Sequence, residues 1–286
     1  MNPILVTGAS GELGRCILKE LSKFSPDGEV FGLVRTPGDA QALSAAGLLS
    51  RIGSCDDPAS LRVALEGVGR LLLVSPEAPV LRAGRNARVI AAAREAGVTY
   101  ITYISFLNAD RSPLRIAAAH AETEAMLAQS GIHHAILRTG WFLENLTCRL
   151  QKDLASGRHP GTSGKGRLSL ASRSDYAAAA AVTILNSEFA GQVYELAGDS
   201  AISREEYTDL LSELSGREVK YRHLTRKEYG KFLRKGGMTP ETSELFADCE
   251  AGARKGWLRS DTGHLSRLIG RPTRTAEELL RIELAK

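Results

Sequence analysis

The stretch Ile4-Leu5-Val6-Thr7-Gly8-Ala9-Ser10-Gly11-Glu12-Leu13-Gly14-Arg15 decides the fold of this chain. A short apolar run ends at three glycines spaced G-x-x-G-x-x-G, and residues compatible with a helix follow at once. The pattern indicates a strand, a tight turn and a helix whose first N–H groups point away from the turn. Free amides and the helix dipole favour negative charge there, so the turn suits a pyrophosphate. A glycine pattern alone is weak evidence, and its context has to support it.

That context is an alternation of short β-branched runs with longer amphipathic stretches. The sequence predicts strands over residues 4–7, 29–34, 49–52, 70–75, 99–104 and 134–138. It predicts helices over 12–24, 39–46, 58–66, 81–96 and 114–130. Six strands separated by helices are typical of an α/β protein with a doubly wound parallel sheet of the Rossmann type.

The pattern changes after Arg138. A helix is predicted from residue 174, and residues 192–197 indicate one more strand returning to the sheet. Helix starts follow at Ser203, Thr225, Thr239 and Thr275. We expect an NADP-binding Rossmann domain over 1–138, with a returning helix and strand at about 174–198. Residues 139–173 and 199–286 then form a smaller, mostly helical substrate lobe without a sheet of its own, closing over the carboxyl ends of the strands.

Composition limits the class of protein. The net charge of +4 over 286 residues is mild and by itself implies no polyanionic partner. The four cysteines lie far apart without a C-x-x-C pair, which favours reduced thiols in the cytoplasm over disulfides or a metal site. The longest alanine-rich stretch, 176–185, is too short to cross a membrane, and a strand beginning by residue 4 leaves no room for a signal peptide. The oligomeric state stays open, a homodimer included.

Arg35 indicates which dinucleotide the turn would take. An acid about 20 residues after the glycines would hold a ribose 2′-hydroxyl, whereas an arginine accommodates a 2′-phosphate. The second predicted strand ends at Val34 and leads straight into Arg35. NADPH is therefore favoured, because arginine makes charge-assisted, bidentate contacts with phosphate. A solvated surface arginine is the alternative, and a nucleotide-sugar or flavin site is less favoured.

The usual acid–base pair of short-chain dehydrogenases is missing. None of the seven tyrosines is followed four residues later by lysine. Ser105, at the end of the fifth predicted strand, stands where such enzymes carry a serine, and we expect it at the cofactor site. Ile116 and His120 take the places of the tyrosine and lysine. Ser75, Pro76 and Glu77 follow the fourth strand at the same edge; they either line the cofactor cleft or form an ordinary turn.

Hydride transfer does not require that pair. A quinone accepts hydride readily, and water or a weak donor can protonate its oxyanion, while the cofactor carries the difficult chemistry. His120 is a candidate catalytic helper, as a contact to the nicotinamide ribose or as a weak proton donor. The alternative is a helix histidine with a structural hydrogen bond.

The segment from Arg138 to Asn145, R-T-G-W-F-L-E-N, follows the last strand of this half and so lies at the ligand edge. Gly140 permits close backbone approach, and Trp141 and Phe142 can wall a flat ring. The Asn145 amide offers a donor to a carbonyl oxygen of a substrate. The aromatic residues are also compatible with mere packing between the lobes.

A basic run extends from Arg217 to Lys235, with eight Lys or Arg against two acids and three aromatic residues interleaved. Such a run is compatible with binding nucleic acid or an acidic partner. It is more often the solvated face of a helix, so nucleic acid is not favoured as a partner.

Together these residues resemble the NmrA-like atypical short-chain dehydrogenases and, within them, the type 2 NAD(P)H:quinone oxidoreductases. The resemblance rests on the glycine turn, Arg35, and residues 103–110, 120–124, 138–145, 173–176, 193–200 and 268–273. It covers nearly the whole chain. Ser54, where relatives commonly carry an acid near the adenine, and Pro76, in place of a small polar residue, depart from the family pattern.

The resemblance implies a cytoplasmic enzyme that reduces quinones or similar planar acceptors with NADPH. Carried over, Gly8, Ala9, Ser10, Gly11, Glu12 and Leu13 would cradle the pyrophosphate, and Arg35 would meet the 2′-phosphate. Ser75 to Glu77 and Gly140, Trp141, Phe142 and Leu143 would line the nicotinamide side. Trp141, Phe142 and Asn145 would shape the acceptor pocket. The alternative is a dinucleotide-binding regulator that reports redox balance through a partner.

Overall fold

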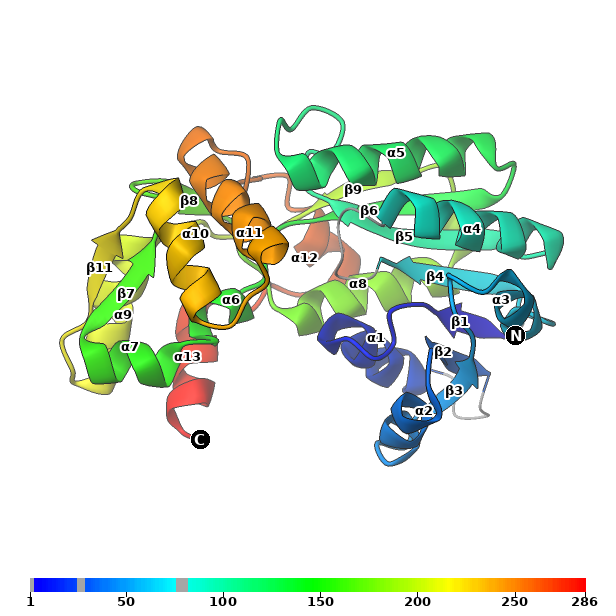
Figure 1. The fold of residues 1–286 in the computed structure, drawn as a ribbon, viewed down its shortest axis with the longest axis horizontal. Helices are drawn as coiled ribbons and strands as arrows, with labels where there is room; N and C mark the ends of the chain where they lie inside the picture. Colours follow the sequence, from blue (N-terminus) through cyan, green and yellow to red (C-terminus); the bar gives the residue numbers. More distant parts are fainter. Residues whose placement is uncertain (1–2, 25–28, 76–81) are drawn as a thin grey trace.

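A seven-stranded parallel sheet forms the centre of the computed structural model, which describes residues 3–24, 29–75 and 82–286 (Figure 1). The strand order is β3-β2-β1-β4-β5-β6-β9. The strands are β1 (Ile4–Val6), β2 (Val30–Val34), β3 (Leu49–Ile52), β4 (Arg70–Val74), β5 (Tyr100–Phe106), β6 (His133–Thr139) and β9 (Val193–Leu196). The chain reverses its direction of travel across the sheet between β1 and β4, and ligands of such folds bind beside that switch point.

Helices cover both faces of this sheet (Figure 1). One face carries α1 (Glu12–Ser22), α2 (Pro37–Ser44), α8 (Arg173–Leu185) and α12 (His264–Ile269). The other carries α3 (Pro58–Ala64), α4 (Arg82–Glu95) and α5 (Arg115–Gln129). Ile4 and Val6 pack into the hydrophobic core beneath α1 and α8, and Leu5 packs into the core beneath α3, α4 and α5, because successive residues of a strand point to opposite faces. The predicted fold class is confirmed.

Local signals place most of the helix starts. Asp57 accepts hydrogen bonds from two N–H groups of α3, and Pro58 follows it as the first helical residue. The helix starts predicted at Ser203, Thr225 and Thr275 are confirmed, and each forms a capping box; Thr239 caps the helix that Pro240 begins. α8 begins with a further capping box, in which Ser172 is the cap. The sequence predicts the start of this helix at residue 174, so the cap at Ser172 is not predicted.

The remaining elements lie beside the strand ends (Figure 1). The helices are α6 (Glu144–Thr147), α7 (Leu150–Ser156), α9 (Arg204–Ser215), α10 (Arg226–Lys235), α11 (Pro240–Gly252) and α13 (Ala276–Leu284), with single 3-10 turns at Ser187–Phe189 and Ala253–Lys255. The strands are β7 (Arg158–Gly161), β8 (Arg167–Leu168), β10 (Ile202–Ser203) and β11 (Lys220–His223).

The expectation of a lobe without a sheet is wrong. β7 pairs with β11 in parallel, and β8 pairs with β10 antiparallel. These strands are too short and too polar to show an alternating pattern, so their pairing depends on tertiary packing. The basic run from Arg217 to Lys235 divides between β11 and α10. Within the described parts of the chain, no helix is long and apolar enough to cross a membrane.

A buried charged cluster holds these outer elements together. Arg204 at the start of α9 forms an ion pair with Glu250 of α11 at 3.2 Å, and both side chains are almost fully buried. The Arg204 guanidinium also approaches His159 Nε2 at 3.2 Å, and the other ring nitrogen contacts Asp153 at 2.7 Å. Burial lowers the pKa of His159. The cluster therefore links α7, β7, α9 and α11 through charges shielded from water.

Removing one partner of this cluster should be costly. We expect Arg204→Met to lower the free energy of unfolding by about 3–5 kcal/mol, because Glu250 would stay buried without its counter-charge. Arg281→Met is the matched control, since Arg281 pairs with Glu277 on the exposed surface of α13, and should change stability by less than about 0.5 kcal/mol. Urea unfolding followed by circular dichroism measures both, and equal effects would contradict the prediction.

Candidate functional site

The glycine turn connects β1 to α1 at the switch point of the sheet. Gly8 has φ +63°, which glycine adopts readily, and a Cβ there would lie 3.0 Å from the Val74 carbonyl oxygen. A Cβ on Gly14 would collide with the Gly8 carbonyl, so α1 packs directly against the turn. Gly11 caps the helix without a side-chain hydrogen bond, leaving the first N–H groups uncapped by a side chain. Three glycines therefore shape an anion cradle.

Thr7 fixes this turn to the neighbouring strand. Its hydroxyl donates to the Val74 carbonyl at 2.8 Å and accepts from the Val74 N–H at 2.8 Å. The last residue of β4 is thereby held beside the glycine turn, and the Ser75 hydroxyl accepts from the Asn86 amide at 2.9 Å. Pro76 and Glu77, the other residues predicted here, lie outside the described residues. The contribution of 75–77 to the cofactor cleft stays a prediction.

Arg35 lies directly after β2, one strand away from the glycine turn. Its side chain is exposed, and it has no hydrogen bond or ion pair with the part of the chain that the structure describes. Thr36 begins α2 as its cap, so the backbone beside Arg35 is fixed while its guanidinium is free. The predicted contact of Arg35 with a 2′-phosphate is compatible with this position and stays a prediction.

The acids near the third strand have other partners. Asp56 forms ion pairs with Arg85 at 2.6 Å and Arg88 at 2.7 Å, and these arginines lower the pKa of its carboxyl. Asp57 caps α3. Relatives commonly carry an acid near the adenine at the position of Ser54. Because Asp56 and Asp57 both have partners within the protein, neither carboxylate is free in this structure to take the place of that acid.

His120 is buried, with both ring nitrogens occupied. Arg82 approaches Nε2 at 2.7 Å, and the Tyr103 hydroxyl approaches Nδ1 at 2.7 Å. Arginine only donates, so Nε2 accepts and the proton sits on Nδ1, donating to Tyr103. Burial and the nearby Arg82 charge hold the pKa of His120 well below its usual range. These contacts favour the alternative that His120 is a helix histidine with structural hydrogen bonds. Its predicted catalytic role stays untested.

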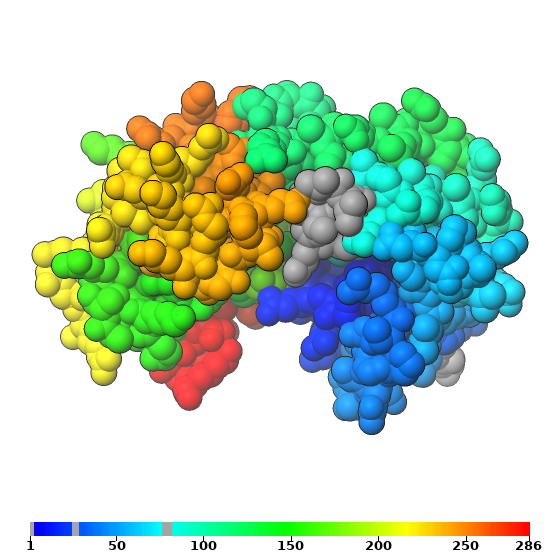
Figure 2. Space-filling model, in the orientation of Figure 1, coloured from blue at the N-terminus to red at the C-terminus, as the bar shows by residue number. Residues whose placement is uncertain are grey.

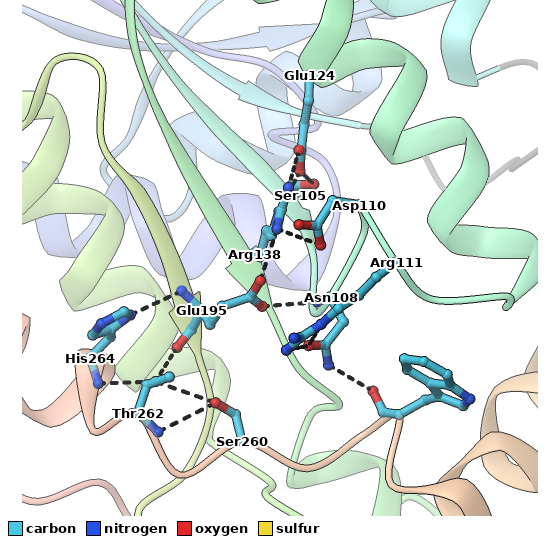
Figure 3. A network of polar contacts seen from close by, with 11 residues as sticks. Ser105, Asn108, Asp110, Arg111, Glu124, Arg138, Glu195, Ser260, Thr262 and His264 are labelled. Atoms are coloured by element: carbon cyan, nitrogen blue, oxygen red, sulfur yellow. Dashed lines mark hydrogen bonds and ion pairs between the residues drawn. The ribbon is translucent and has the colours of Figure 1, made fainter.

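Ser105 belongs to a network of ion pairs at the ends of β5 and β6 (Figure 3). Its hydroxyl donates to Glu124 of α5, and Glu124 accepts from Arg138 at 2.6 Å. Arg138 also contacts Glu195 of β9 at 2.9 Å and Asp110 at 2.8 Å. These carboxylates raise the pKa of Arg138. The Ser105 hydroxyl is therefore already engaged within the protein, and its predicted contact with the cofactor stays untested.

The same network reaches the outer elements through Asn108, which has φ +57° (Figure 3). Its N–H donates to Glu195 at 2.9 Å, and its amide approaches the Trp257 carbonyl at 3.4 Å. Glu195 is held from its other side, since its own carbonyl accepts from Thr262 at 2.8 Å. This arrangement could not be predicted from the sequence, because its members come from distant parts of the chain.

The segment after β6 divides its side chains between core and surface. Trp141 is buried and packs edge-on against Phe246 of α11, with ring centroids 5.0 Å apart. Leu143 is also buried, whereas Phe142 and Asn145 are only partly buried. The side-chain amide of Asn145 makes no hydrogen bond with any described residue, whereas its backbone N–H donates to the Phe142 carbonyl at 3.1 Å. Packing in the hydrophobic core that Trp141 shares with Phe106 and Leu114 and with the outer elements therefore accounts for this residue. Phe142 and Asn145 keep exposed surface that a ligand can use.

Phe142 is held on two sides. Tyr176 of α8 meets its ring edge at a centroid distance of 5.6 Å, and the Arg173 guanidinium lies over the ring at 4.9 Å. Gly140 sits behind it, where an added Cβ would approach the Tyr176 hydroxyl to 3.2 Å. The face drawn in Figure 2 is hollowed between the blue N-terminal helices and the green, yellow and red outer elements.

The packing at Gly14 gives a direct test of the cradle. We expect Gly14→Ala to weaken binding of a pyrophosphate ligand at least about 10-fold, because its methyl group pushes α1 away from the turn. Gly84→Ala in α4 is the matched control, since no described atom beyond its chain neighbours and its own helix backbone lies within 4 Å of an added Cβ there, and alanine favours helix. Fluorescence titration with a reduced dinucleotide measures both; unchanged binding in Gly14→Ala would contradict this role.

Comparison with known proteins agrees with this geometry. Residues 8–187 match the family described as NAD(P)H-binding. The chain is 42% identical to quinone oxidoreductase 2 of Escherichia coli over 96% of each protein. The E. coli NADPH-dependent quinone oxidoreductase complexed with NADPH superposes with a TM-score of 0.92, covering 98% of this chain and 99% of that chain. The Citrobacter sp. triphenylmethane reductase complexed with NADP(H) is 28% identical, with a TM-score of 0.90 over 97% and 99% of the chains.

The family match over residues 8–187 includes the glycine turn and strands β2 to β6 of the central sheet. An NmrA-like family domain-containing oxidoreductase of Aspergillus flavus is also 27% identical over 98% of this chain and 95% of its own length. The resemblance to NmrA-like proteins is thereby confirmed. This chain belongs to the NAD(P)H-binding family.

Proposed function

We propose that this protein is a cytoplasmic NADPH-dependent oxidoreductase that transfers a hydride to quinones or similar small planar acceptors. The observation that supports NADPH is Arg35, an exposed arginine with no described partner at the edge where the 2′-phosphate is expected. The quinone is supported by the 42% identity to the E. coli quinone oxidoreductase. The four cysteines are all free, which agrees with a reducing compartment.

The residues divide between two tasks. The turn formed by Gly8, Ala9, Ser10, Gly11, Glu12 and Leu13 holds the pyrophosphate through its free backbone N–H groups, while the Gly11 N–H donates to the Gly8 carbonyl and fixes the turn. Arg35 binds the 2′-phosphate. Bound NADPH supplies the hydride. Ser75 and the segment from Gly140 to Leu143 position the nicotinamide. Within that segment the partly exposed ring of Phe142 provides a flat wall for the acceptor.

Asn145 gives this wall its polarity. Its amide is free of described partners and donates to an acceptor carbonyl, where negative charge develops during hydride transfer. The proton that completes reduction comes from water or a weak donor, because the sequence has no Tyr-x-x-x-Lys pair. Such a site suits quinones, whose reduced oxyanions are stable enough to need no strong acid.

Oxidation of NADPH by benzoquinone tests the proposal. We expect the purified protein to accelerate the loss of absorbance at the reduced-nicotinamide band well above the uncatalysed rate. The control is the same assay without protein at matched quinone concentration. A rate no higher than this control would overturn the assignment as a quinone reductase and favour a dinucleotide-binding regulator.

The cofactor preference has its own test. Arg35→Asp should weaken NADPH binding by about 10- to 100-fold, because a charge-assisted contact is replaced by repulsion. NADH lacks the 2′-phosphate, so its affinity should change by less than about 3-fold. Fluorescence titration gives both dissociation constants. Equal losses for the two dinucleotides would mean that Arg35 does not contact the 2′-phosphate.

A further inference from the structure

The basic run from Arg217 to Lys235 has no task in the site described above. It holds an excess of six positive charges, since eight Lys or Arg stand against two acids. The whole chain has a net charge of only +4, so the remaining residues together are slightly acidic. The positive charge of this protein is therefore concentrated in one short segment.

Much of this charge is not neutralised within the protein. Three of the eight cations have acidic partners, namely Lys220, Arg226 and Arg234. Glu228, one of the two acids in the run, accepts from the Thr225 N–H at 2.9 Å as part of the capping box of α10. Five cations are exposed or partly exposed and form no ion pair with any residue that the structure describes: Arg217, Arg222, Lys227, Lys231 and Lys235.

Three of these cations form a row along α10. Lys227, Lys231 and Lys235 follow one another at intervals of four residues, so they lie on one side of the helix. All three are exposed. Tyr229 and Leu233, on the opposite side, are buried in a small hydrophobic cluster with a residue of α11. This lysine row therefore faces away from the protein and extends over about 12 Å.

The lysine row has charge but no anchor beside it. Phe232 stacks on Tyr229 with ring centroids 6.1 Å apart, and the Arg149 guanidinium lies over the Phe232 ring at 4.5 Å. Within residues 217–235, all of which the structure describes, no large apolar side chain is exposed. Sites for single-stranded nucleic acid present aromatic rings for base stacking, and protein interfaces present aromatic or arginine anchors at their centre. A row of lysines without anchors instead suits a diffuse negative surface, such as a layer of anionic lipid headgroups.

The helix with the lysine row lies on the same face of the molecule as the candidate site. Figure 2 shows the yellow to orange outer elements, α10 among them, beside the hollow that separates them from the blue N-terminal helices. α10 packs against α11, and Phe246 of α11 packs against Trp141 in the segment after β6. A protein that rests on a surface through this face therefore turns its hollow toward that surface.

We propose that the lysine row of α10 docks this protein on an anionic lipid surface, from which the site takes a quinone dissolved in the lipid. Apolar quinones partition into lipid, so docking brings the site to the layer that holds them. The source of the acceptor rests on the proposed function, whereas the docking itself does not. The attraction is electrostatic, and each lysine near the surface strengthens partitioning by about 5-fold.

Sedimentation with lipid vesicles tests the docking without any turnover. We expect the protein to bind phosphatidylcholine vesicles that contain phosphatidylglycerol and to leave vesicles of phosphatidylcholine alone unbound. Raising the salt concentration to about 1 M should release it, because the Debye length then falls to about 3 Å. Equal binding to the two kinds of vesicle, or binding to neither, would overturn the proposal.

A triple variant separates the lysine row from the net charge of the protein. Lys227→Gln, Lys231→Gln and Lys235→Gln together should weaken binding to the anionic vesicles by about 100-fold. The control variant has the same net charge but loses, by substitution with glutamine, three exposed lysines outside the run: Lys19, Lys165 and Lys255. We expect the control to bind nearly as the unchanged protein does. Equal losses in the two variants would reject a docking role for the row.

Polyuridylate is the probe for the nucleic-acid alternative. Fluorescence anisotropy with the labelled polymer at physiological salt should show no binding that the triple variant loses and the control variant keeps. Binding of that kind would assign the lysine row to nucleic acid and overturn the assignment to lipid.

Turnover connects the docking to the acceptor. With a long-chain quinone dissolved in the anionic vesicles, the triple variant should oxidise NADPH at least about 10-fold more slowly than the control variant. With water-soluble benzoquinone the two rates should be equal. Slowing with both acceptors would place the lysines in the reaction and reject their role in docking. If the unchanged protein reduces no quinone, the proposed function fails while the vesicle binding stands, so the two proposals fail separately.

Discussion

The arrangement of the ligand edge depends on the ion pairs of Arg138. This cation lies one residue before the end of β6 and is almost buried, so it must be neutralised within the protein. Glu124, Glu195 and Asp110 supply the countercharges from α5, β9 and the turn after β5 (Figure 3). Because each carboxylate comes from a different part of the chain, α5, β9 and the turn after β5 are held in one position around Arg138. The segment from Gly140 onward begins only two residues beyond this fixed point.

A second constraint acts at the other side of the switch point. α1 approaches the glycine turn so closely that Gly14 has no room for a methyl group. The helix start is thereby aimed at the space beyond β1, and its uncapped amides supply positive potential there. Arg35 and Arg173 lie on either side of this start, beyond β2 and at the beginning of α8. Two cations thus border this edge of the sheet. Arg173 already has acidic partners within the protein, namely Glu12 and Glu144.

The predictions succeeded where the information was local. Most strands and helices of the first half lie within two residues of their predicted bounds, since hydrophobic periodicity and caps act over a few residues. The two small sheets escaped detection because their pairing joins residues about 35 to 60 positions apart in short polar strands. His120 and Trp141 show the same limit. Each was chosen for its chemistry, and each has partners from distant elements that bury it.

The sequence by itself determined the alternating α/β class, the glycine turn and the placement of Arg35, because each follows from spacing within one βαβ unit. Only the tertiary structure decided which polar side chains stay available to a ligand. Burial and hydrogen bonding depend on segments far apart in the chain, and they engage Ser105 and His120 while leaving Phe142 and Asn145 partly exposed. The ion pair between Arg173 and Glu12 is likewise decided by the tertiary structure. The two residues are separated by 160 residues of chain, and the packing of α1 against α8 brings their side chains together.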